Sequence, residues 1–434
     1  MPVCRQRSQT NIVIPDNPGN KTDTVVNMNT CREVMISKFD RVREHTEALC
    51  KPLEIDDYQL QSIVQTSPPK WHIAHVTWFF EAFVLPHFHP DFAYLFNSYY
   101  YTVGKMHPRS DRGLLSRPTV EEVWRYRTYV DERVRELLAS VDESHWEELA
   151  FRVNLGLNHE EQHQELLLMD IKHNFWINPL KPAYRHDLVI PTGKTRPVRW
   201  IERSGEMCQI GHENEGFAYD NETPRHDVLI HGHRLADRFV TNGEYLAFME
   251  DGGYADPALW MSDGWALLQR KGWSHPLYWE QNDRGWMQFT LGGMRELNPH
   301  EPVCHLSYYE ADAYARWAGK RLPLESELET MMVEQPTEGN FINRGMLHPA
   351  PAYETGLWYG DLWAWTGSPY AAYPGFKPLA GSMGEYNGKF MSNQVVLKGG
   401  CCVTPAGHVR ASYRNFYYPD ERWAFTGLRL AEDV

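Results

Sequence analysis

The 434-residue sequence predicts an α+β protein, in which a four-helix bundle precedes a loop-rich domain of mixed structure. Apolar residues recur at helical spacing through much of residues 29–177, which predicts the bundle. Four prolines then interrupt the pattern between residues 178 and 197, where we expect a linker. Residues 198–434 contain short apolar runs, frequent Gly and Trp, and few long helical stretches. This change predicts a second, loop-dominated domain.

The composition suits a globular protein of two domains and excludes several classes of partner. A single core rarely serves more than about 250–300 residues. The net charge of −14 argues against nucleic acid or an anionic membrane as partner, and no apolar run approaches the roughly 18 residues of a membrane span. Seven cysteines without an apolar N-terminal signal region predict reduced thiols and a cytoplasmic location. The sequence leaves homo-oligomerisation open.

The elements of the bundle follow from periodicity and capping signals. Residues 1–28 are polar and lack periodicity, so we expect a disordered tail. Amphipathic stretches predict helices over residues 29–53, 70–85, 119–139 and 151–175. A capping box of Thr119 and Glu122 marks the third helix, and residues 86–117 form one long connection before it. In the second domain, amphipathic stretches predict helices over residues 241–249 and 307–318.

Two histidines of the fourth predicted helix form a candidate metal grip. His159 and His163 are four residues apart and therefore lie on one helical face. Glu165 follows two residues after His163 and points about 200° away, at about 100° per residue. A catalytic metal needs a third protein ligand, which a bundle provides from a facing helix.

The second predicted helix offers this third ligand in the segment Trp71-His72-Ile73-Ala74-His75. Its inward face carries Trp71 and Trp78, and His75 shares that face because it lies four residues after Trp71. We therefore predict His75 as a ligand, with His72 nearby as a support for a ligand or as a substrate contact. Three imidazoles suit zinc, iron, copper or nickel, so these residues alone do not choose the metal.

Several motifs of the first domain resemble a known family. They are PPKWHIAHVTWFFEAFVL at residues 68–85, NSYY at 97–100, RGLLSRP at 112–118 and HEEQHQE at 159–165. Together they resemble the DinB-like metal-binding bundle of the ergothioneine sulfoxide synthases, known as EgtB. Motifs of the second domain are FVTNGEY at 239–245, AGKRLPLE at 318–325, LWAWT at 362–366 and GLRL at 427–430. They resemble the C-type-lectin-like domain shared with formylglycine-generating enzymes.

The resemblance covers nearly the whole chain after residue 30, with both domains in the family's order. It implies a non-heme iron(II) enzyme that uses O₂ to join the sulfur of a cysteine-type thiol to C2 of the imidazole of trimethylhistidine (hercynine), giving a sulfoxide. The family's HxxxHxE motif lands on His159, His163 and Glu165, and its upstream ligand lands on His75. Resemblance and helix geometry therefore indicate the same three ligands.

The resemblance also implies catalytic residues in the long connection. Tyr99 and Tyr100 match the NSYY segment of one branch of the family, in which these tyrosines are the catalytic pair. One of them would donate a proton near the bound oxygen. A substrate carboxylate would be held by Arg109 or Arg112, which lie in the same connection.

Further substrate contacts come from both domains. Gln162 matches a glutamine that contacts hercynine in the family. The segment Arg414-Asn415-Phe416 resembles one whose asparagine faces the trimethylammonium group of the substrate. Phe416 and Tyr417 would add the aromatic walls that a quaternary ammonium favours.

The identity of the thiol stays open between cysteine and γ-glutamylcysteine. The mycobacterial branch has an acidic and then a basic residue that hold the glutamyl group, where this chain has Tyr417 and Glu421. The tyrosines that this branch uses near the lectin-like core are also absent around residues 378–388. Both departures favour the NSYY branch and, with it, free cysteine.

Four alternatives have distinct signatures. A formylglycine-generating enzyme needs separated reactive cysteines and lacks the bundle, whereas Cys401 and Cys402 are adjacent. A zinc-dependent thiol transferase of the DinB type would use the same histidines without O₂. An ovothiol-type synthase would join cysteine to C5 of unmethylated histidine, and it usually carries an additional methyltransferase domain. A non-catalytic protein would combine a structural metal bundle with a lectin-like binding domain, and its zinc site would be closed by a fourth protein ligand.

Overall fold

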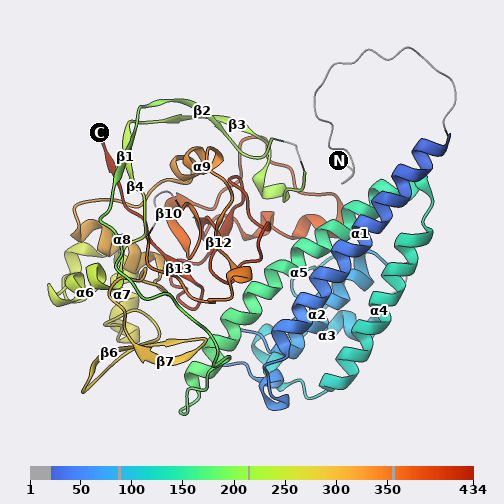
Figure 1. Cartoon of the computed structure of the whole chain (residues 1–434), viewed down its shortest axis with the longest axis horizontal. Helices are drawn as coiled ribbons and strands as arrows, with labels where there is room; N and C mark the ends of the chain where they lie inside the picture. The colour runs from blue at the N-terminus through green and yellow to red at the C-terminus, as the bar shows by residue number, and fades with distance from the viewer. Residues whose placement is uncertain (1–20, 87–88, 214–215, 354–356) are drawn as a thin grey trace. The chain divides into compact units, whose positions relative to one another are not determined.

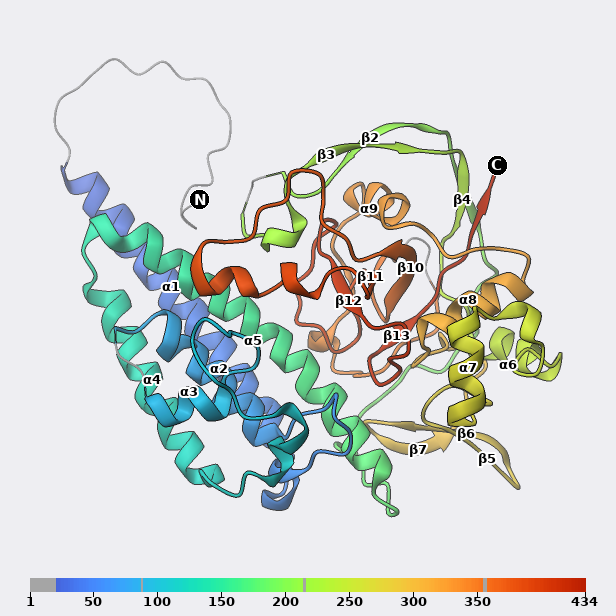
Figure 2. The same ribbon diagram turned by 180° about the vertical axis from the view of Figure 1, so that it is seen from behind.

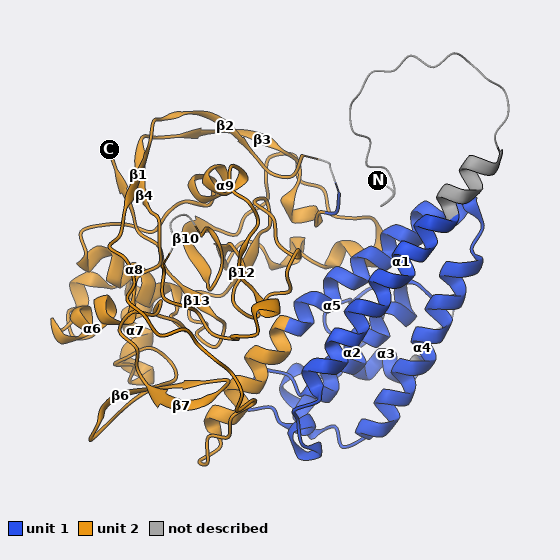
Figure 3. Cartoon of the chain, viewed as in Figure 1, with its two compact units in different colours: residues 1–164, 214–217 blue, residues 165–213, 218–434 orange. Residues whose placement is uncertain are grey.

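The computed structural model describes residues 21–86, 89–213, 216–353 and 357–434. The chain divides into two compact units (Figure 3). Unit 1 comprises Met1–Gln164 with Asn214–Phe217, and unit 2 comprises Glu165–Glu213 with Ala218–Val434. A helical unit precedes a loop-rich unit with small sheets, which confirms the predicted α+β class. The division falls inside a helix rather than in the proline-rich segment 178–197, and the predicted domain boundaries stay predictions.

Unit 1 is a bundle whose long helices lie side by side (Figures 1 and 2). Its elements are α1 (Lys21–Cys50), η1 (Ile55–Gln59), α2 (Pro69–Phe83), α3 (Pro90–Phe96), η2 (Arg109–Leu114), α4 (Val120–Ser140) and the part of α5 (Glu143–Ile177) that precedes Glu165. The four predicted bundle helices correspond to α1, α2, α4 and α5. The predicted long connection contains α3 and η2, which the sequence analysis did not predict.

Two helix starts differ from the prediction. Helix α1 begins at Lys21, so residues 21–28 are helical where a tail was predicted, and residues 1–20 lie outside the described residues. No Gly or Pro separates Lys21 from the amphipathic stretch, so nothing in the sequence ends the helix at residue 29. Helix α5 begins eight residues before the predicted position 151, at Glu143, because Trp146 and Leu149 already pack into the core.

The core of unit 1 forms where apolar stripes of four helices meet. Phe39 of α1, Phe80 of α2, Val130 of α4 and Val153 of α5 are fully buried in one cluster. The rings of Phe39 and Phe80 pack edge to face with their centroids 5.2 Å apart. Such burial is the main source of stability for amphipathic helices in a bundle.

A buried carboxylate joins three of these helices. Glu160 of α5 is fully buried and lies 2.7 Å from Arg43 of α1 and 2.7 Å from Arg127 of α4. Thr46 of α1 donates a third hydrogen bond to it at 2.6 Å. Burial alone would raise the pKa of Glu160, but Arg127 and Arg43 outweigh burial and lower it to about 2. Glu160 is therefore ionised and fully paired in the interior of unit 1.

Unit 2 consists of small sheets and short helices joined by long loops. Its sheets have the strand orders β1-β4-β14, β12-β11-β10-β13, β2-β3, β5-β6-β7 and β8-β9. Their strands are β1 (Trp200–Arg203), β2 (Glu206–Ile210), β3 (His226–Ile230), β4 (His233–Ala236), β5 (Trp279–Asn282), β6 (Gly285–Thr290), β7 (Gly293–Glu296), β8 (Gly339–Asn340), β9 (Tyr359–Gly360), β10 (Trp363–Pro369), β11 (Val395–Lys398), β12 (Asn415–Tyr417), β13 (Thr426–Gly427) and β14 (Ala431–Asp433). Strand β12 pairs antiparallel with β11 and forms one edge of the four-stranded sheet.

The helices of unit 2 follow capping signals where these exist. They are α6 (Asn242–Glu250), α7 (Ser262–Lys271), α8 (Tyr308–Trp317) and α9 (Glu325–Val333). Thr241 and Ser307 form capping boxes at α6 and α8, which are the two helices that the sequence predicts. Helices α7 and α9 were not predicted, because their N-cap residues, Met261 and Leu324, have no polar side chain that would mark a helix start.

The structure bears on two features that the composition addresses, namely membrane-spanning segments and the state of the cysteines. Within the described residues, no helix is both long enough and apolar enough to cross a membrane. Cys50, Cys208, Cys304, Cys401 and Cys402 are free thiols.

Replacing Glu160 tests the buried ion pairs. We expect Glu160→Gln to lower the free energy of unfolding by about 3–5 kcal/mol, because two buried arginines would lose the carboxylate that they share. Arg43 would then retain only Asp131, and Arg127 only the half-exposed Glu47. Chemical denaturation of the full chain measures this change.

The exposed pair between Arg133 and Glu136 provides the matched control. Glu136→Gln should change the free energy of unfolding by less than about 1 kcal/mol, because water screens this pair. Equal effects of the two substitutions would contradict the assigned role of Glu160.

Candidate metal centre

Three imidazoles from two helices converge in unit 1. His75 lies in α2, and His159 and His163 lie one turn apart in α5. One ring nitrogen from each lies within 4.8 Å of the other two, close enough for all three to bind one metal ion. Nε2 of His75 and Nε2 of His159 are 3.2 Å apart. His75 and His159 are buried, and His163 is partly exposed.

A close approach of α2 and α5 brings the three histidines together. Gly156 of α5 lies three residues before His159, and a Cβ added to it would lie 2.7 Å from the ring of Phe80 in α2. A larger residue at this position would push the two helices apart. Gly156 therefore has a packing reason to stand inside a helix, where glycine otherwise costs about 1 kcal/mol relative to alanine.

Aromatic rings hold two of the imidazoles in place. Trp71 stacks on His75 with ring centroids 4.5 Å apart and an interplanar angle of 12°. The ring centroid of Phe79 lies 4.5 Å from that of His159. These apolar walls exclude water from one side of the group and restrict rotation of the rings.

Hydrogen bonds orient two of the ligands. Nδ1 of His75 donates to the carbonyl of Phe96 at 2.5 Å, which leaves Nε2 with its lone pair directed at the group. Nδ1 of His163 lies 2.8 Å from Nδ1 of His72, so one of these nitrogens donates to the other. If His163 donates, its Nε2 keeps the lone pair for a metal. Partners of this kind fix the tautomer of metal-binding histidines.

The environment keeps the imidazoles neutral, which is the form that binds metals. Burial lowers the pKa of His159 to about 3. Burial and the neighbouring histidines lower the pKa of His75 and of His163 well below the usual range. The three residues therefore fit a divalent metal ion in donor type, protonation and spacing.

The predicted tyrosines lie in the turn that follows α3. The side chain of Asn97 fixes this turn, because it accepts from the backbone N–H of Tyr100 at 3.0 Å and donates to its carbonyl at 2.9 Å. The rings of Tyr99 and Tyr100 are 4.7 Å apart. Tyr100 is buried, and its ring centroid lies 6.3 Å from that of Phe79, which contacts His159. Burial raises the pKa of Tyr99, so its hydroxyl is protonated at neutral pH.

The two predicted arginines lie in different environments. Arg112 is buried, and its guanidinium lies 3.4 Å from the ring centroid of Trp71, which stacks on His75. It donates to the hydroxyls of Ser67 and Ser98 at 3.0 Å each. Arg109 is exposed and donates to the carbonyl of Gln65. The structure thus brings Arg112 next to the histidines and leaves Arg109 at the surface.

Gln162 and Glu165 occupy different faces of α5. Gln162 is partly exposed and directly precedes His163. Glu165 is buried and belongs to unit 2, where its carboxylate accepts from Nε1 of Trp363 at 2.7 Å and from the hydroxyl of Thr404 at 2.5 Å. It lies outside the group of three histidines, in agreement with its predicted direction.

The remaining predicted residues form β12 in unit 2. Neighbouring residues of a strand face opposite sides, and Phe416 stacks on Tyr370 with ring centroids 4.0 Å apart. The side chain of Asn415 forms a hydrogen bond with that of Tyr417, on the other side of the strand. Phe416 and Tyr417 therefore face opposite sides of β12 and cannot both line one side of a binding site. The sequence alone does not indicate this separation.

The sequence predicts His72 as a support for a ligand or as a substrate contact, but it does not indicate which histidine His72 contacts, nor the other contacts that support the ligands. The contact between His72 and His163, and the stacking of Arg112 on Trp71, join residues far apart in the sequence. Helical spacing reports only neighbours on the same element, so it gave no signal for either contact. Glu160 lies next to His159, yet a single glutamate among the polar residues of this helix does not reveal its buried arginine partners.

Comparison with known proteins confirms the resemblance found in the sequence. The DinB superfamily model matches residues 38–167, and the sulfatase-modifying factor enzyme 1-like domain model matches residues 191–334. Three relatives named hercynine oxygenase come from mycobacteria. The protein from Mycolicibacterium smegmatis is 30% identical over 441 residues, covering 93% of this chain and 99% of its own length. The Mycolicibacterium thermoresistibile protein is 30% identical with coverages of 76% and 78%, and the Mycobacterium tuberculosis protein is 31% identical with coverages of 66% and 72%.

Replacing His72 tests its contact with His163. We expect His72→Phe to weaken metal affinity about 10–100-fold, as the loss of a hydrogen-bond partner of a ligand does in other metal sites. Titration of the metal-free protein with Co(II), followed by absorption, measures the affinity directly.

His72→Asn should retain most of the affinity, because its amide oxygen can accept from His163. His145 lies exposed on the same helix as His163, so His145→Gln is the control and should leave Co(II) binding unchanged. Unaltered affinity in His72→Phe would show that the contact does not support the ligand.

Proposed function

This chain belongs to the hercynine oxygenase family, and on that premise we propose that it is a non-heme iron(II) sulfoxide synthase of ergothioneine biosynthesis. It would join C2 of the hercynine imidazole to the sulfur of cysteine or of γ-glutamylcysteine. The carbon–sulfur bond replaces one C–H and one S–H bond. One atom of O₂ enters the sulfoxide and the other leaves as water, so atoms and electrons balance.

The observation that carries the proposal is the convergence of His75, His159 and His163 in a chain that spans 99% of a hercynine oxygenase. The relatives provide the reaction class, and the three imidazoles provide a site that suits it. Neutral nitrogen ligands from only three residues leave coordination positions for a thiol and for O₂.

Iron(II) is the ion that we propose for this site, and when bound it supplies the redox chemistry for O₂ and lowers the pKa of a coordinated thiol. The protein would hold it with His75, His159 and His163. Phe96 and His72 would keep two of these rings in the orientation that binding requires. Trp71 and Phe79 would exclude water from the apolar side.

Arg112 is the residue that we propose for a substrate carboxylate. Its two hydroxyl partners and the face of Trp71 fix the position of the Arg112 guanidinium. Trp71 also stacks on His75, so one aromatic ring contacts both the guanidinium and the metal ligand. A carboxylate bound there would be held close to the histidines, and fixed geometry of this kind contributes to the rate. Arg109 is exposed and is the weaker of the two candidates.

Tyr99 and Tyr100 are the proposed proton donors. Burial keeps the hydroxyl of Tyr99 protonated, and the pair lies next to an aromatic residue that contacts His159. Gln162 is proposed to contact the hercynine imidazole. From unit 2, we propose Asn415, Phe416 and Tyr417 as substrate contacts on the basis of the family resemblance.

Turnover by the iron-loaded chain tests the proposal. Protein purified without O₂ and loaded with iron(II) should consume O₂ when it receives hercynine together with cysteine or γ-glutamylcysteine. Mass spectrometry should then detect the coupled sulfoxide. Unmethylated histidine with cysteine serves as the control pair, since its coupling at C5 would indicate an ovothiol-type reaction. The proposal fails if neither thiol gives a hercynyl sulfoxide.

Phenylalanine substitutions test the role of the tyrosines. We expect Tyr99→Phe or Tyr100→Phe to lower the coupling rate about 10²–10⁴-fold, the usual contribution of a positioned proton donor, while Co(II) affinity stays unchanged. Tyr101→Phe is the matched control, because Tyr101 is the exposed next residue of the same turn. Loss of metal binding in Tyr99→Phe or Tyr100→Phe would assign the residue a structural role.

A further inference from the structure

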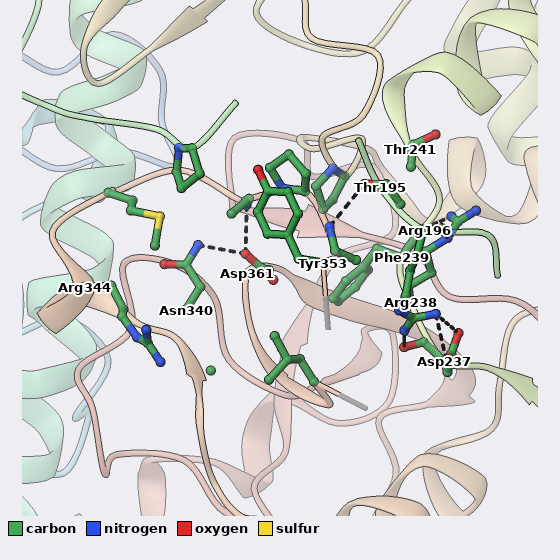
Figure 4. A pocket seen from close by; sticks show the side chains of 18 of the residues that line it. Thr195, Arg196, Asp237, Arg238, Phe239, Thr241, Asn340, Arg344, Tyr353 and Asp361 are labelled. Carbon is green, nitrogen blue, oxygen red and sulfur yellow. Dashed lines mark hydrogen bonds and ion pairs between the residues drawn. The ribbon is translucent and has the colours of Figure 1, made fainter. Parts of the chain in front are cut away.

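A cavity inside unit 2 forms a second candidate site. Its volume is about 250 Å³, far above the 10–15 Å³ that one water molecule needs. The described residues that line it all belong to unit 2, and none of them has a role in the function proposed above. Figure 4 shows Asn340, Asp361 and Tyr353 along its wall, with Arg344 at one edge and Arg196, Asp237 and Arg238 at the opposite edge.

The arginines at the second edge already have acidic partners. Arg196 pairs with Asp237 at 2.9 Å, and Arg238 pairs with Glu244 at 2.7 Å. These four charges compensate one another and leave nothing for a ligand to neutralise. They form a rigid frame for the cavity.

Arg429 is the exception among the buried cations of the wall. It is only 3% exposed, and within the described residues its Nη1 has no hydrogen-bond partner. Its guanidinium packs 4.2 Å from the ring centroid of Phe239 and 4.8 Å from that of Trp358, and it donates to the carbonyl of Leu357. Burial lowers its pKa to about 10, against the opposing attraction of Asp361 and Asp237. A buried donor without a partner costs about 1–3 kcal/mol, and more when it is charged.

Asp361 is the corresponding buried anion. It lines the same cavity and has a φ of +55°, a left-handed conformation that few residues other than glycine adopt. Its Oδ1 accepts from the side-chain amide of Asn340 at 2.7 Å and from the backbone N–H of Ala350 at 2.9 Å, and both donors are neutral. Burial raises its pKa. Its backbone is held in place by hydrogen bonds to Asn340 and Cys402, so the carboxylate has a fixed position.

Asn340 adds an acceptor to this side of the cavity. Its Nδ2 donates to Asp361 and to the carbonyl of His348, whereas its Oδ1 is buried and has no partner within the described residues. The wall therefore presents an unused donor on a cation, Arg429, and an unused acceptor beside an anion, Asp361. Arg429 and Asp361 attract each other, but this attraction gives neither Nη1 of Arg429 nor Oδ1 of Asn340 a hydrogen-bond partner. Buried polar atoms in native proteins normally have such a partner.

We propose that this cavity binds a small α-amino acid with an apolar side chain, with the carboxylate on Arg429 and the ammonium group on Asn340 and Asp361. A zwitterion is the ligand class that completes both groups at once. Phe239, Met346 and Leu357 contribute apolar wall, which suits a hydrocarbon side chain. The volume lies just below the range of about 300–1,000 Å³ for drug-sized ligands, in keeping with a small molecule.

Calorimetry of the full chain with three matched probes tests the site. The probes are L-leucine, 4-methylpentanoate, which lacks the ammonium group, and 3-methylbutylamine, which lacks the carboxylate. None has a thiol or an imidazole, so none resembles the substrates of the proposed reaction. We expect L-leucine to bind at least tenfold more tightly than either analogue, because only L-leucine satisfies both buried groups.

Two substitutions assign the contacts. Arg429→Met keeps a long side chain against Phe239 and removes the charge, so L-leucine should lose at least tenfold in affinity while 3-methylbutylamine is unaffected. Asp361→Asn keeps a hydrogen-bond acceptor and a residue type that tolerates positive φ. It should weaken L-leucine and leave 4-methylpentanoate unchanged. Circular dichroism and the melting temperature confirm that each variant is folded.

Control variants separate this site from the metal centre. His75→Ala should leave L-leucine binding intact even when it abolishes coupling, and Arg133→Gln at the exposed surface should change neither. The proposal is overturned if L-leucine shows no saturable binding, if the two analogues bind as tightly as L-leucine, or if His75→Ala abolishes binding. None of these results bears on the proposed coupling reaction, which the turnover assay tests separately.

Discussion

The ion pairs of Glu160 are the constraint on which the geometry of the metal centre depends. This carboxylate has no access to water and takes its charge compensation from Arg43 of α1 and Arg127 of α4. Arg43 also contacts Asp131 of α4 at 2.6 Å, so the two arginines link three helices around one buried group. A buried ion is strongly unfavourable when its partners move away, which fixes the rotation of α5 relative to α1 and α4. Because Glu160 directly follows His159, the same rotation directs the histidines toward α2.

Residues 159–165 of helix α5 face three different environments. At about 100° per residue, His159 and His163 share one face, Glu160 and Gln164 share a second, and Glu165 occupies a third. Gln164 repeats the role of Glu160 one turn later, with hydrogen bonds to the hydroxyl of Thr46 and the carbonyl of Val42. Glu165 accepts hydrogen bonds from the side chains of Trp363 and Thr404 in unit 2. Few positions in this stretch are therefore free to vary without altering the bundle, the metal ligands or the packing of unit 2.

The sequence predicts the parts of this arrangement that repeat along one element. The spacing of His159 and His163, the inward face shared by Trp71 and His75, and the direction of Glu165 all follow from 3.6 residues per turn. The contacts of His72 with His163 and of Arg112 with Trp71 depend on how separate segments pack, and periodicity within one helix does not encode such packing. The same limit applies in unit 2. Phe416 and Tyr417 are adjacent in the sequence, but only the assignment of a strand shows that they face opposite sides.

The central claim is that His75, His159 and His163 hold iron(II) and leave coordination positions open for the thiol and O₂. X-ray absorption spectroscopy of the iron(II)-loaded protein tests this most directly, before and after addition of cysteine under argon. We expect three imidazole nitrogens in the first coordination sphere and, with cysteine, an added sulfur scatterer. In His163→Ala the spectrum should contain fewer imidazole nitrogens. A carboxylate ligand in place of an imidazole, or a first coordination sphere that does not change when cysteine is added, would contradict the account.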